Sequence, residues 1–136
     1  MTVEELIILH EGERLHPYRC PAGRLTIGVG RNIEDNGISR DESRMLLRND
    51  IERSRRELST FAFSRKLCPV REAVLLDMLF NLGLTRFKSF RKMLVALGQG
   101  DYNKAAEEMV NSFWYNQVGN RAKRLVEMMR TGEWPV

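Results

Sequence analysis

Seven glycines and prolines lie between residues 12 and 38 and separate two stretches of different pattern. Glycine and proline interrupt helices and mark turns. The short runs that they leave, 18–20 and 25–29, are typical of strands joined by a turn at 21–23. Apolar residues before this region and after it recur at helical spacing. We therefore predict a small β region with one helix before it and a mostly helical region after it.

Capping boxes mark the start of the first two helices. Thr2 is followed three residues later by Glu5, and Ser39 by Glu42, the spacing that satisfies two free N–H groups reciprocally. The first helix is expected to end near residue 10, because Gly12 follows. The second is expected over 40–58.

The next predicted helix, 70–82, begins after Pro69 and is apolar on most sides, which is typical of a buried central helix. Shorter helices are predicted at 90–97, 102–111 and 120–130. The predicted fold is α+β and mostly helical, a single domain with two lobes. Its parts are a β-hairpin lobe (12–38), a long interlobe helix (39–60) and a helical lobe (61–136 together with 1–11). A binding cleft is expected between the lobes.

Composition limits the classes of partner. The formal net charge of +4 suits an anionic partner, whether nucleic acid, a membrane surface or an acidic wall polymer. Two cysteines are too few for a disulfide framework and form no zinc-ligand spacing with the two histidines. The N-terminus shows neither a basic region nor a long apolar run. We expect no metal or other cofactor, no membrane insertion and no export signal.

Glu11 stands where the first helix ends, between His10 and Gly12. A carboxylate there meets the negative end of the helix macrodipole, which favours the protonated form. A carboxylic acid that keeps its proton can act as a general acid. The alternative is a solvated surface glutamate, which is what most glutamates are.

Three blocks of sequence resemble the phage lysozymes of the T-even type, glycoside hydrolase family 24. The first is Glu11-Gly12, Tyr18, Cys20, Thr26-Ile27-Gly28 and Gly30, where the spacings from glutamate to cysteine and on to threonine agree with the family pattern. The second is Phe80 with Leu82-Gly83. The third runs from Trp114-Tyr115-Asn116-Gln117 through Asn120 to Arg124, and ends with Arg130-Thr131-Gly132 and Trp134.

The resemblance implies a lysozyme-like fold and a muramidase, which hydrolyses the β-1,4 bond between N-acetylmuramic acid and N-acetylglucosamine in peptidoglycan with inversion. It implies that Glu11 is the general acid, that Cys20 and Thr26 place the attacking water, and that Arg121 pairs with Glu11. Taken alone, Cys20 is as well explained as a small buried residue and Thr26 as a strand residue.

Further substrate-binding positions are implied at Gly30, Phe80, Asn81 and Glu108. For Phe80, substrate contact and a place in the core are equally good interpretations. In the family, a histidine pairs with an acidic residue on the interlobe helix. This chain has Arg31 at the histidine position and Asp50 at the acidic one, so we expect an ion pair between Arg31 and Asp50.

Competing functions remain open at this point. One is a peptidoglycan-binding module of the same fold with weak catalysis, because a cysteine thiol is mostly protonated at neutral pH, where the aspartate of the T-even enzyme is ionised. Another is a nucleic-acid binder, although the arginines of 48–56 are better explained as a solvated helix face. We expect a monomer that binds peptidoglycan strands and no nucleic acid. It is expected to wait in the host cytoplasm until a holin releases it to the wall in the periplasm.

Overall fold

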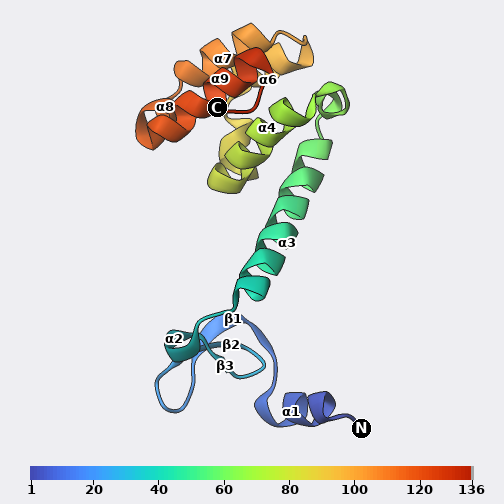
Figure 1. Ribbon diagram of the computed structural model, residues 1–136, viewed down its shortest axis with the longest axis vertical. Coiled ribbons are helices and arrows are strands. Elements are labelled where there is room, and N and C mark those ends of the chain that lie inside the picture. The colour runs from blue at the N-terminus through green and yellow to red at the C-terminus, as the bar shows by residue number, and fades with distance from the viewer. Residues whose placement is uncertain (136) are drawn as a thin grey trace. The chain divides into compact units, whose positions relative to one another are not determined.

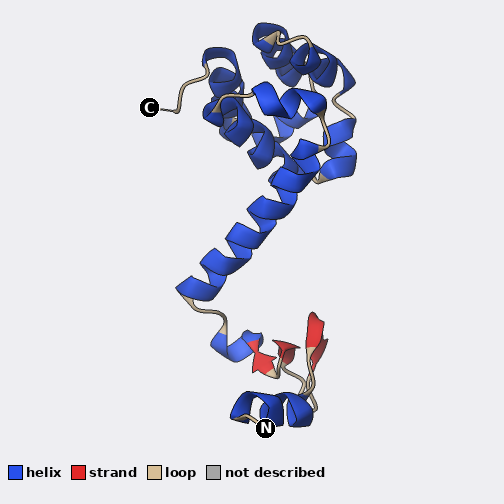
Figure 2. Cartoon of the chain, turned by 90° about the vertical axis from the view of Figure 1, so that its right-hand side faces the viewer, coloured by secondary structure: helices blue, strands red, loops and turns tan. Residues whose placement is uncertain are grey.

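A computed structural model describes residues 1–135 of the chain (Figure 1). It divides into two compact units, Met1–Leu46 and a second that begins at Leu47. Helices predominate, and the strands form one small antiparallel sheet (Figure 2). This confirms the predicted α+β, mostly helical fold class. The assignment of residues 1–11 to a helical lobe stays a prediction.

The N-terminal unit holds the sheet. Its elements are α1 (Val3–Glu11), β1 (Arg14–Arg19), β2 (Leu25–Gly28), β3 (Arg31–Asn32), α2 (Ile33–Asn36) and the start of α3 (Arg40–Ser59). The strand order is β1-β2-β3, with Tyr18 opposite Thr26 and Thr26 opposite Asn32. Strand β1 begins four residues before the predicted strand, and a register shift between Arg14 and Tyr18 accommodates the extra length.

Both capping boxes form as predicted. The Thr2 hydroxyl accepts from the Glu5 N–H at 3.1 Å, and Glu5 Oε2 accepts from the Thr2 N–H at 2.9 Å. The same reciprocal pair joins Ser39 and Glu42 at the start of α3. Local sequence therefore fixes where these two helices begin.

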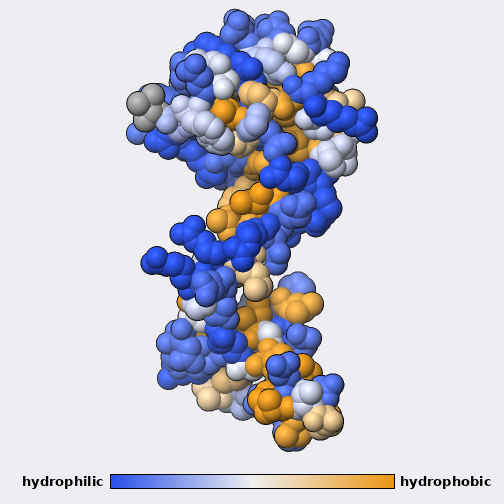
Figure 3. All heavy atoms as spheres, turned by 45° about the vertical axis from the view of Figure 1, so that its right-hand side comes forward, coloured by the Kyte–Doolittle hydropathy of each residue, from blue (hydrophilic) through white to orange (hydrophobic). Residues whose placement is uncertain are grey.

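Apolar side chains lie at the surface of the N-terminal unit (Figure 3). On α1, Val3 and Leu9 are 68% and 67% exposed, and no residue of this helix is buried. Of the described residues before Leu47, only Thr26 is buried, with 3% exposure. This unit is therefore held mainly by strand pairing, helix caps and charged contacts.

The second unit has the hydrophobic core. After the rest of α3 come the 3-10 helix η1 (Ala62–Lys66), α4 (Pro69–Leu82), α5 (Leu84–Lys88), α6 (Arg91–Gly98), α7 (Tyr102–Val110), α8 (Phe113–Val118) and α9 (Asn120–Thr131). Val74, Leu75 and Met78 of α4 have no exposed surface. The predicted buried central helix is thus confirmed, and α5 to α9 all add residues to the same core.

Two α-helices of this unit, α5 and α8, and the 3-10 helix η1 were not predicted. Helix α5 has five residues and α8 has six, too few for an apolar period to stand out. A Ser112 cap, whose hydroxyl accepts from the Tyr115 N–H at 3.2 Å, starts α8.

Candidate active site

Glu11 is the last residue of α1, where Gly12 ends the helix with a positive φ of 73°. The Gly12 N–H donates to the Ile8 carbonyl at 2.8 Å. A side chain at residue 12 would be strained in this conformation. The helix therefore stops where the sequence predicts, and the carboxyl of Glu11 stands at its C-terminal end.

The Glu11 carboxyl lies directly against Gly30, in the turn between β2 and β3. A Cβ atom placed on Gly30 would come within 2.8 Å of Glu11 Oε2 and 3.1 Å of its Cδ. Gly30 also has a positive φ of 62°. Two residues selected from the sequence, nineteen positions apart, thus meet in space, and only glycine leaves room for the carboxyl where it is.

Cys20 and Thr26 flank the turn that joins β1 to β2. The Cys20 N–H donates to the Arg24 carbonyl at 3.0 Å, and the Cys20 carbonyl accepts from the Gly23 N–H at 2.8 Å. The Thr26 hydroxyl donates to the same Arg24 carbonyl at 2.8 Å. The structure therefore brings this pair together, as expected.

Hydrogen bonds lower the pKa of the Cys20 thiol below its ordinary value of 9.0. The main cause is the backbone of Arg24, with partial burial opposing it and the backbone of Ala22 assisting. The hydroxyl of Thr26 donates its proton to the Arg24 carbonyl at 2.8 Å. Its oxygen therefore keeps lone pairs that can accept a further hydrogen bond. Thiolate and hydroxyl together can orient a water molecule and take a proton from it.

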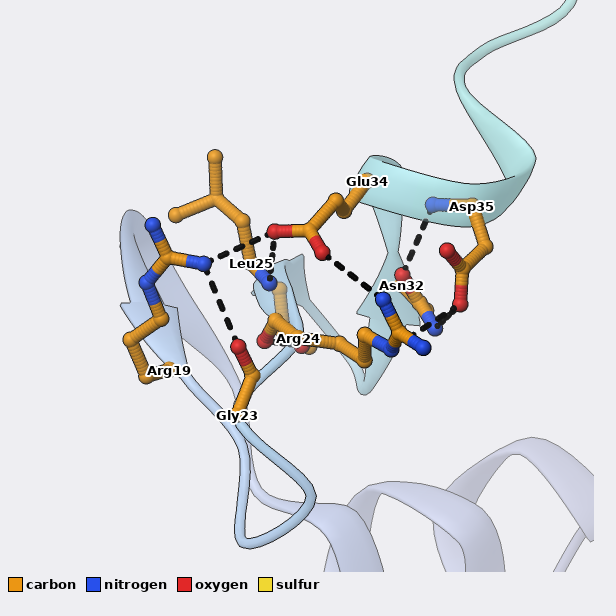
Figure 4. Close-up of polar contacts among 8 residues, drawn as sticks. Arg19, Gly23, Arg24, Leu25, Asn32, Glu34 and Asp35 are labelled. Atoms are coloured by element: carbon orange, nitrogen blue, oxygen red, sulfur yellow. Dashed lines mark hydrogen bonds and ion pairs between the residues drawn. The ribbon is translucent and has the colours of Figure 1, made fainter.

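A charged cluster surrounds the same turn (Figure 4). Glu34 pairs with Arg19 at 2.7 Å and with Arg24 at 3.1 Å. It also accepts from the Leu25 N–H at 3.3 Å. Sequence reasoning missed Glu34, because an acidic residue at the start of a four-residue helix carries no periodic signal. The arginines on both sides of the predicted turn were the one available hint.

The expected Arg31–Asp50 ion pair would join the two units and stays a prediction, while within its own unit each residue has another partner. Both Nη atoms of Arg31 contact the Glu42 carboxylate, at 2.9 and 2.8 Å, whereas Asp50 pairs with Arg53 one turn along α3. Glu42 is already fixed close by, since it belongs to the Ser39 capping box. The arginine holds the pKa of Glu42 at about 2, below its ordinary 4.5.

The remaining predicted residues lie in the second unit. Phe80 is 50% exposed, so it is not part of the core. Asn81 Oδ1 accepts from the indole N–H of buried Trp114 at 3.4 Å. Arg121 pairs with Asp77 at 2.8 Å, and its predicted pairing with Glu11 stays a prediction.

Glu108 lines a cavity of about 650 Å³ whose other lining residues lie between Leu82 and Gln117, from the end of α4 to α8. Its side chain is only 12% exposed and lies 3.4 Å from Lys104 Nζ. The same cavity is lined by three cations, Arg86, Arg91 and Lys92, none of which forms an ion pair within residues 1–135. Phe113, 78% exposed, adds an apolar wall. The cavity therefore suits a ligand that carries both negative groups and apolar surface.

Residues 1–135 bring together no group of three or more histidine, cysteine, aspartate or glutamate side chains able to hold a metal ion. Over the same range, no helix has both the length and the apolar character needed to cross a membrane.

Comparison with known proteins places this geometry in context. The family model described as phage lysozyme matches residues 9–131. A probable T4-type lysozyme of Dictyostelium discoideum is 24% identical and is covered over 95% of its length, by 96% of this chain. An endolysin of Acyrthosiphon pisum secondary endosymbiont phage 1 is 34% identical over 77% of this chain and 73% of its own.

A third relative is a part of a larger protein. The pre-baseplate central spike protein Gp5 of Enterobacteria phage T4 is 29% identical to 97% of this chain, which covers 28% of that protein. The family match contains Glu11 and Gly30, which contact each other, and Cys20 and Thr26, which both donate to the Arg24 carbonyl; all four residues belong to the N-terminal unit. The chain belongs to the phage lysozyme family and is an enzyme of the lysozyme type, with peptidoglycan as its substrate.

Proposed function

We propose that the protein is an inverting muramidase that cleaves the β-1,4 bond between N-acetylmuramic acid and N-acetylglucosamine. The observation that carries this proposal is the Glu11 carboxyl packed against Gly30, in the same unit as Cys20 and Thr26, which both donate to the Arg24 carbonyl. One group can give a proton, and the other two can hold a water. An inverting glycosidase needs both functions, about 6.5–9.5 Å apart across the sugar.

In the proposed reaction, Glu11 gives its proton to the glycosidic oxygen as the bond from that oxygen to the anomeric carbon breaks. A water held by Thr26 attacks the anomeric carbon from the opposite face, and the Cys20 thiolate takes the proton that the water loses. The lowered pKa of Cys20 increases the thiolate fraction near neutral pH. Glu11 and Cys20 then exchange protons with solvent before the next cycle.

Substrate contacts are proposed for Gly30, Phe80, Asn81 and Glu108, with Arg121 as a supporting residue. The cavity beside Glu108 holds cations that suit the carboxylates of wall peptides, as well as apolar surface for their methyl groups. The proposed setting is bacterial lysis, with a monomeric enzyme made in the host cytoplasm and released to the wall by a holin.

A second setting has its own support. The similarity to a part of a phage spike protein extends over 97% of this chain. A lysozyme fixed to such a device would open the wall locally rather than lyse the cell. Coexpression with a holin distinguishes the two: rapid culture clearing supports the endolysin role, and clearing no faster than with the holin alone supports the second setting.

Digestion of purified peptidoglycan in ¹⁸O-labelled water tests the reaction itself. We expect a reducing N-acetylmuramic acid end that carries ¹⁸O at its anomeric carbon, formed first as the α-anomer. A reducing N-acetylglucosamine end would refute the proposed bond, and an initial β-anomer would refute inversion.

Variants of Cys20 test its role. We expect Cys20→Ser to lose most activity and Cys20→Asp to keep a substantial part. In the parent enzyme, activity should rise with pH as the thiol ionises, at a pH below the 9.0 of an ordinary thiol. The aspartate variant should lose this limb, because its carboxylate is already ionised. Full activity of Cys20→Ala would show that the residue takes no part.

A further inference from the structure

Glu34 accepts hydrogen bonds from the residues that immediately precede Cys20 and Thr26 in the chain, although it lies on a different element from either of them. It lies in the first turn of α2, directly after β3. Asn32 caps this helix by accepting from the Asp35 N–H at 3.0 Å. The close-up shows the Glu34 side chain reaching from α2 to the chain on both sides of the β1–β2 turn (Figure 4).

The bonds of Glu34 reach the chain neighbours of both residues of the pair. Oε1 accepts from Arg19 Nη1 at 2.7 Å, and Arg19 immediately precedes Cys20. The same oxygen accepts from the Leu25 N–H at 3.3 Å, and Leu25 immediately precedes Thr26. One carboxylate oxygen thus joins the end of β1 to the start of β2.

Arg24 links the other carboxylate oxygen to the turn itself. Its Nη1 donates to Glu34 Oε2 at 3.1 Å, and its Nε lies 3.5 Å from Asp35 Oδ2. The carbonyl of Arg24 accepts from both the Cys20 N–H and the Thr26 hydroxyl. Any shift of Arg24 would therefore move the hydrogen bonds of both Cys20 and Thr26.

The charges in this cluster balance. Two guanidinium groups face two carboxylates, those of Glu34 and Asp35. Arg24 and the Leu25 N–H hold the pKa of Glu34 below its ordinary value, so the carboxylate stays charged well into acid. One hydrogen bond lies within the turn, from Arg19 to the Gly23 carbonyl at 3.1 Å. Among residues 1–135, the side-chain bonds between the turn and α2 come from Glu34 and Asp35.

We propose that Glu34 is a positioning residue that sets the separation and orientation of the Cys20 thiol and the Thr26 hydroxyl, and with them the position of the attacking water. The inference rests on the muramidase mechanism proposed above. Glu34 itself touches no reacting atom. It acts through Arg19, Arg24 and Leu25.

Glu34→Gln tests this, with Glu42→Gln as the matched control. Glu42 likewise accepts from a backbone N–H, that of Ser39 at 2.8 Å, and pairs with one arginine, Arg31 of β3, whose side chain bonds to Glu42 and Gly37 rather than to the Cys20 turn. We expect kcat to fall about tenfold in Glu34→Gln, which corresponds to an activation free energy about 1.4 kcal/mol higher. KM should stay within twofold of the parent value. Glu42→Gln should change kcat less than twofold. Equal losses in both variants would overturn the proposal.

A double-mutant cycle separates positioning from general support of the fold. In the Cys20→Ser background, Glu34→Gln should cost no further activity, because the geometry that it maintains is already useless. A second tenfold loss there would show that Glu34 acts independently of Cys20. If Glu34→Gln does not fold, Arg24→Gln is the variant to use, because Glu34 then keeps Arg19 and the Leu25 N–H as partners. We expect kcat to fall about threefold in Arg24→Gln. An unchanged kcat would count against the proposal.

Amide chemical shifts give a readout that does not depend on activity. We expect the Cys20 and Thr26 amide resonances to move in Glu34→Gln and to stay in place in Glu42→Gln. Moved resonances would support the positioning role whether or not the parent enzyme releases reducing muramic acid ends. Failure to release those ends would refute the proposed reaction alone. Unmoved resonances in Glu34→Gln would refute the positioning role alone.

Discussion

The two units of the chain are stabilised by different means. The second unit buries a continuous set of apolar side chains from α3 to α9, several with no exposed surface. In the first, Thr26 alone among the described residues is buried, and caps, strand pairing and ion pairs hold the elements together. Burial of apolar side chains involves no titrating group and is not weakened by charge screening, whereas exposed ion pairs depend on ionisation and are screened by salt. The proposed proton donor and water-binding pair thus lie in the unit whose structure depends most on charge.

Matched methionine substitutions give the largest expected difference between the units. Met78 is fully buried in α4, whereas Met45 in the first unit is 56% exposed. Met78→Ala should lower the free energy of unfolding by about 2–5 kcal/mol, because it leaves a cavity. Met45→Ala should change it by no more than about 0.5 kcal/mol. Denaturant titration followed by far-UV circular dichroism, which reports the helices of both units, measures both, and similar losses would contradict the contrast.

Gly30→Ala should reduce activity more than it reduces stability. The added methyl group would meet Glu11 Oε2 at 2.8 Å, and a flexible carboxyl would move aside and leave its working position. Gly37→Ala is the control, since Gly37 has a similar φ of 60° and open space around it. Both should pay about 1–2 kcal/mol of backbone strain, but only Gly30→Ala should lose activity, by at least about tenfold. Equal activity of the two variants would show that the Glu11–Gly30 contact is unimportant.

The cations of the Glu108 cavity should give a smaller effect, on binding alone. Lys92→Gln removes one charge from the cavity, and Lys123→Gln removes one from α9 outside it. We expect Lys92→Gln to raise KM for peptidoglycan about two- to fivefold at low salt, the range of one exposed ion pair. Lys123→Gln should leave KM unchanged. If the two variants behave alike, only net charge matters.

Acid titration should give the smallest effect. The pKa of Glu42 is lowered from 4.5 to about 2 by Arg31, so its ion pair stabilises the fold above pH 4.5 and loses that contribution as the pH falls towards 2. Glu42→Gln should abolish this part of the acid sensitivity. Unfolding midpoints measured between pH 5 and 2 would show it as a flatter curve for the variant. A curve as steep as that of the parent would mean that other carboxylates carry the response.

Sequence predicted the features that depend on local rules. The caps at Thr2 and Ser39, the buried helix between Pro69 and Gly83, and the end of α1 at Gly12 follow from residue types at fixed spacings. The family pattern singled out both Glu11 and Gly30, but the contact between them was not predicted, because no local rule relates residues nineteen positions apart.

Charged partners were the part that sequence could not predict. Arg31 pairs with Glu42, a partner that was not predicted, and the capping box at Ser39 holds that carboxylate in place. Glu34 was not expected to matter at all. Long flexible side chains choose partners from the tertiary surroundings, which propensity and periodicity do not encode.

Glu11→Gln is the most direct test of whether Glu11 is the proton donor. The amide keeps the size of the side chain and cannot supply the proton, so release of reducing muramic acid ends should fall by about a thousandfold, within the usual range for general acid catalysis. Sedimentation with cell walls should show that the variant still binds. Cleavage by Glu11→Gln at the parental rate would contradict the assignment of Glu11 and the mechanism built on it.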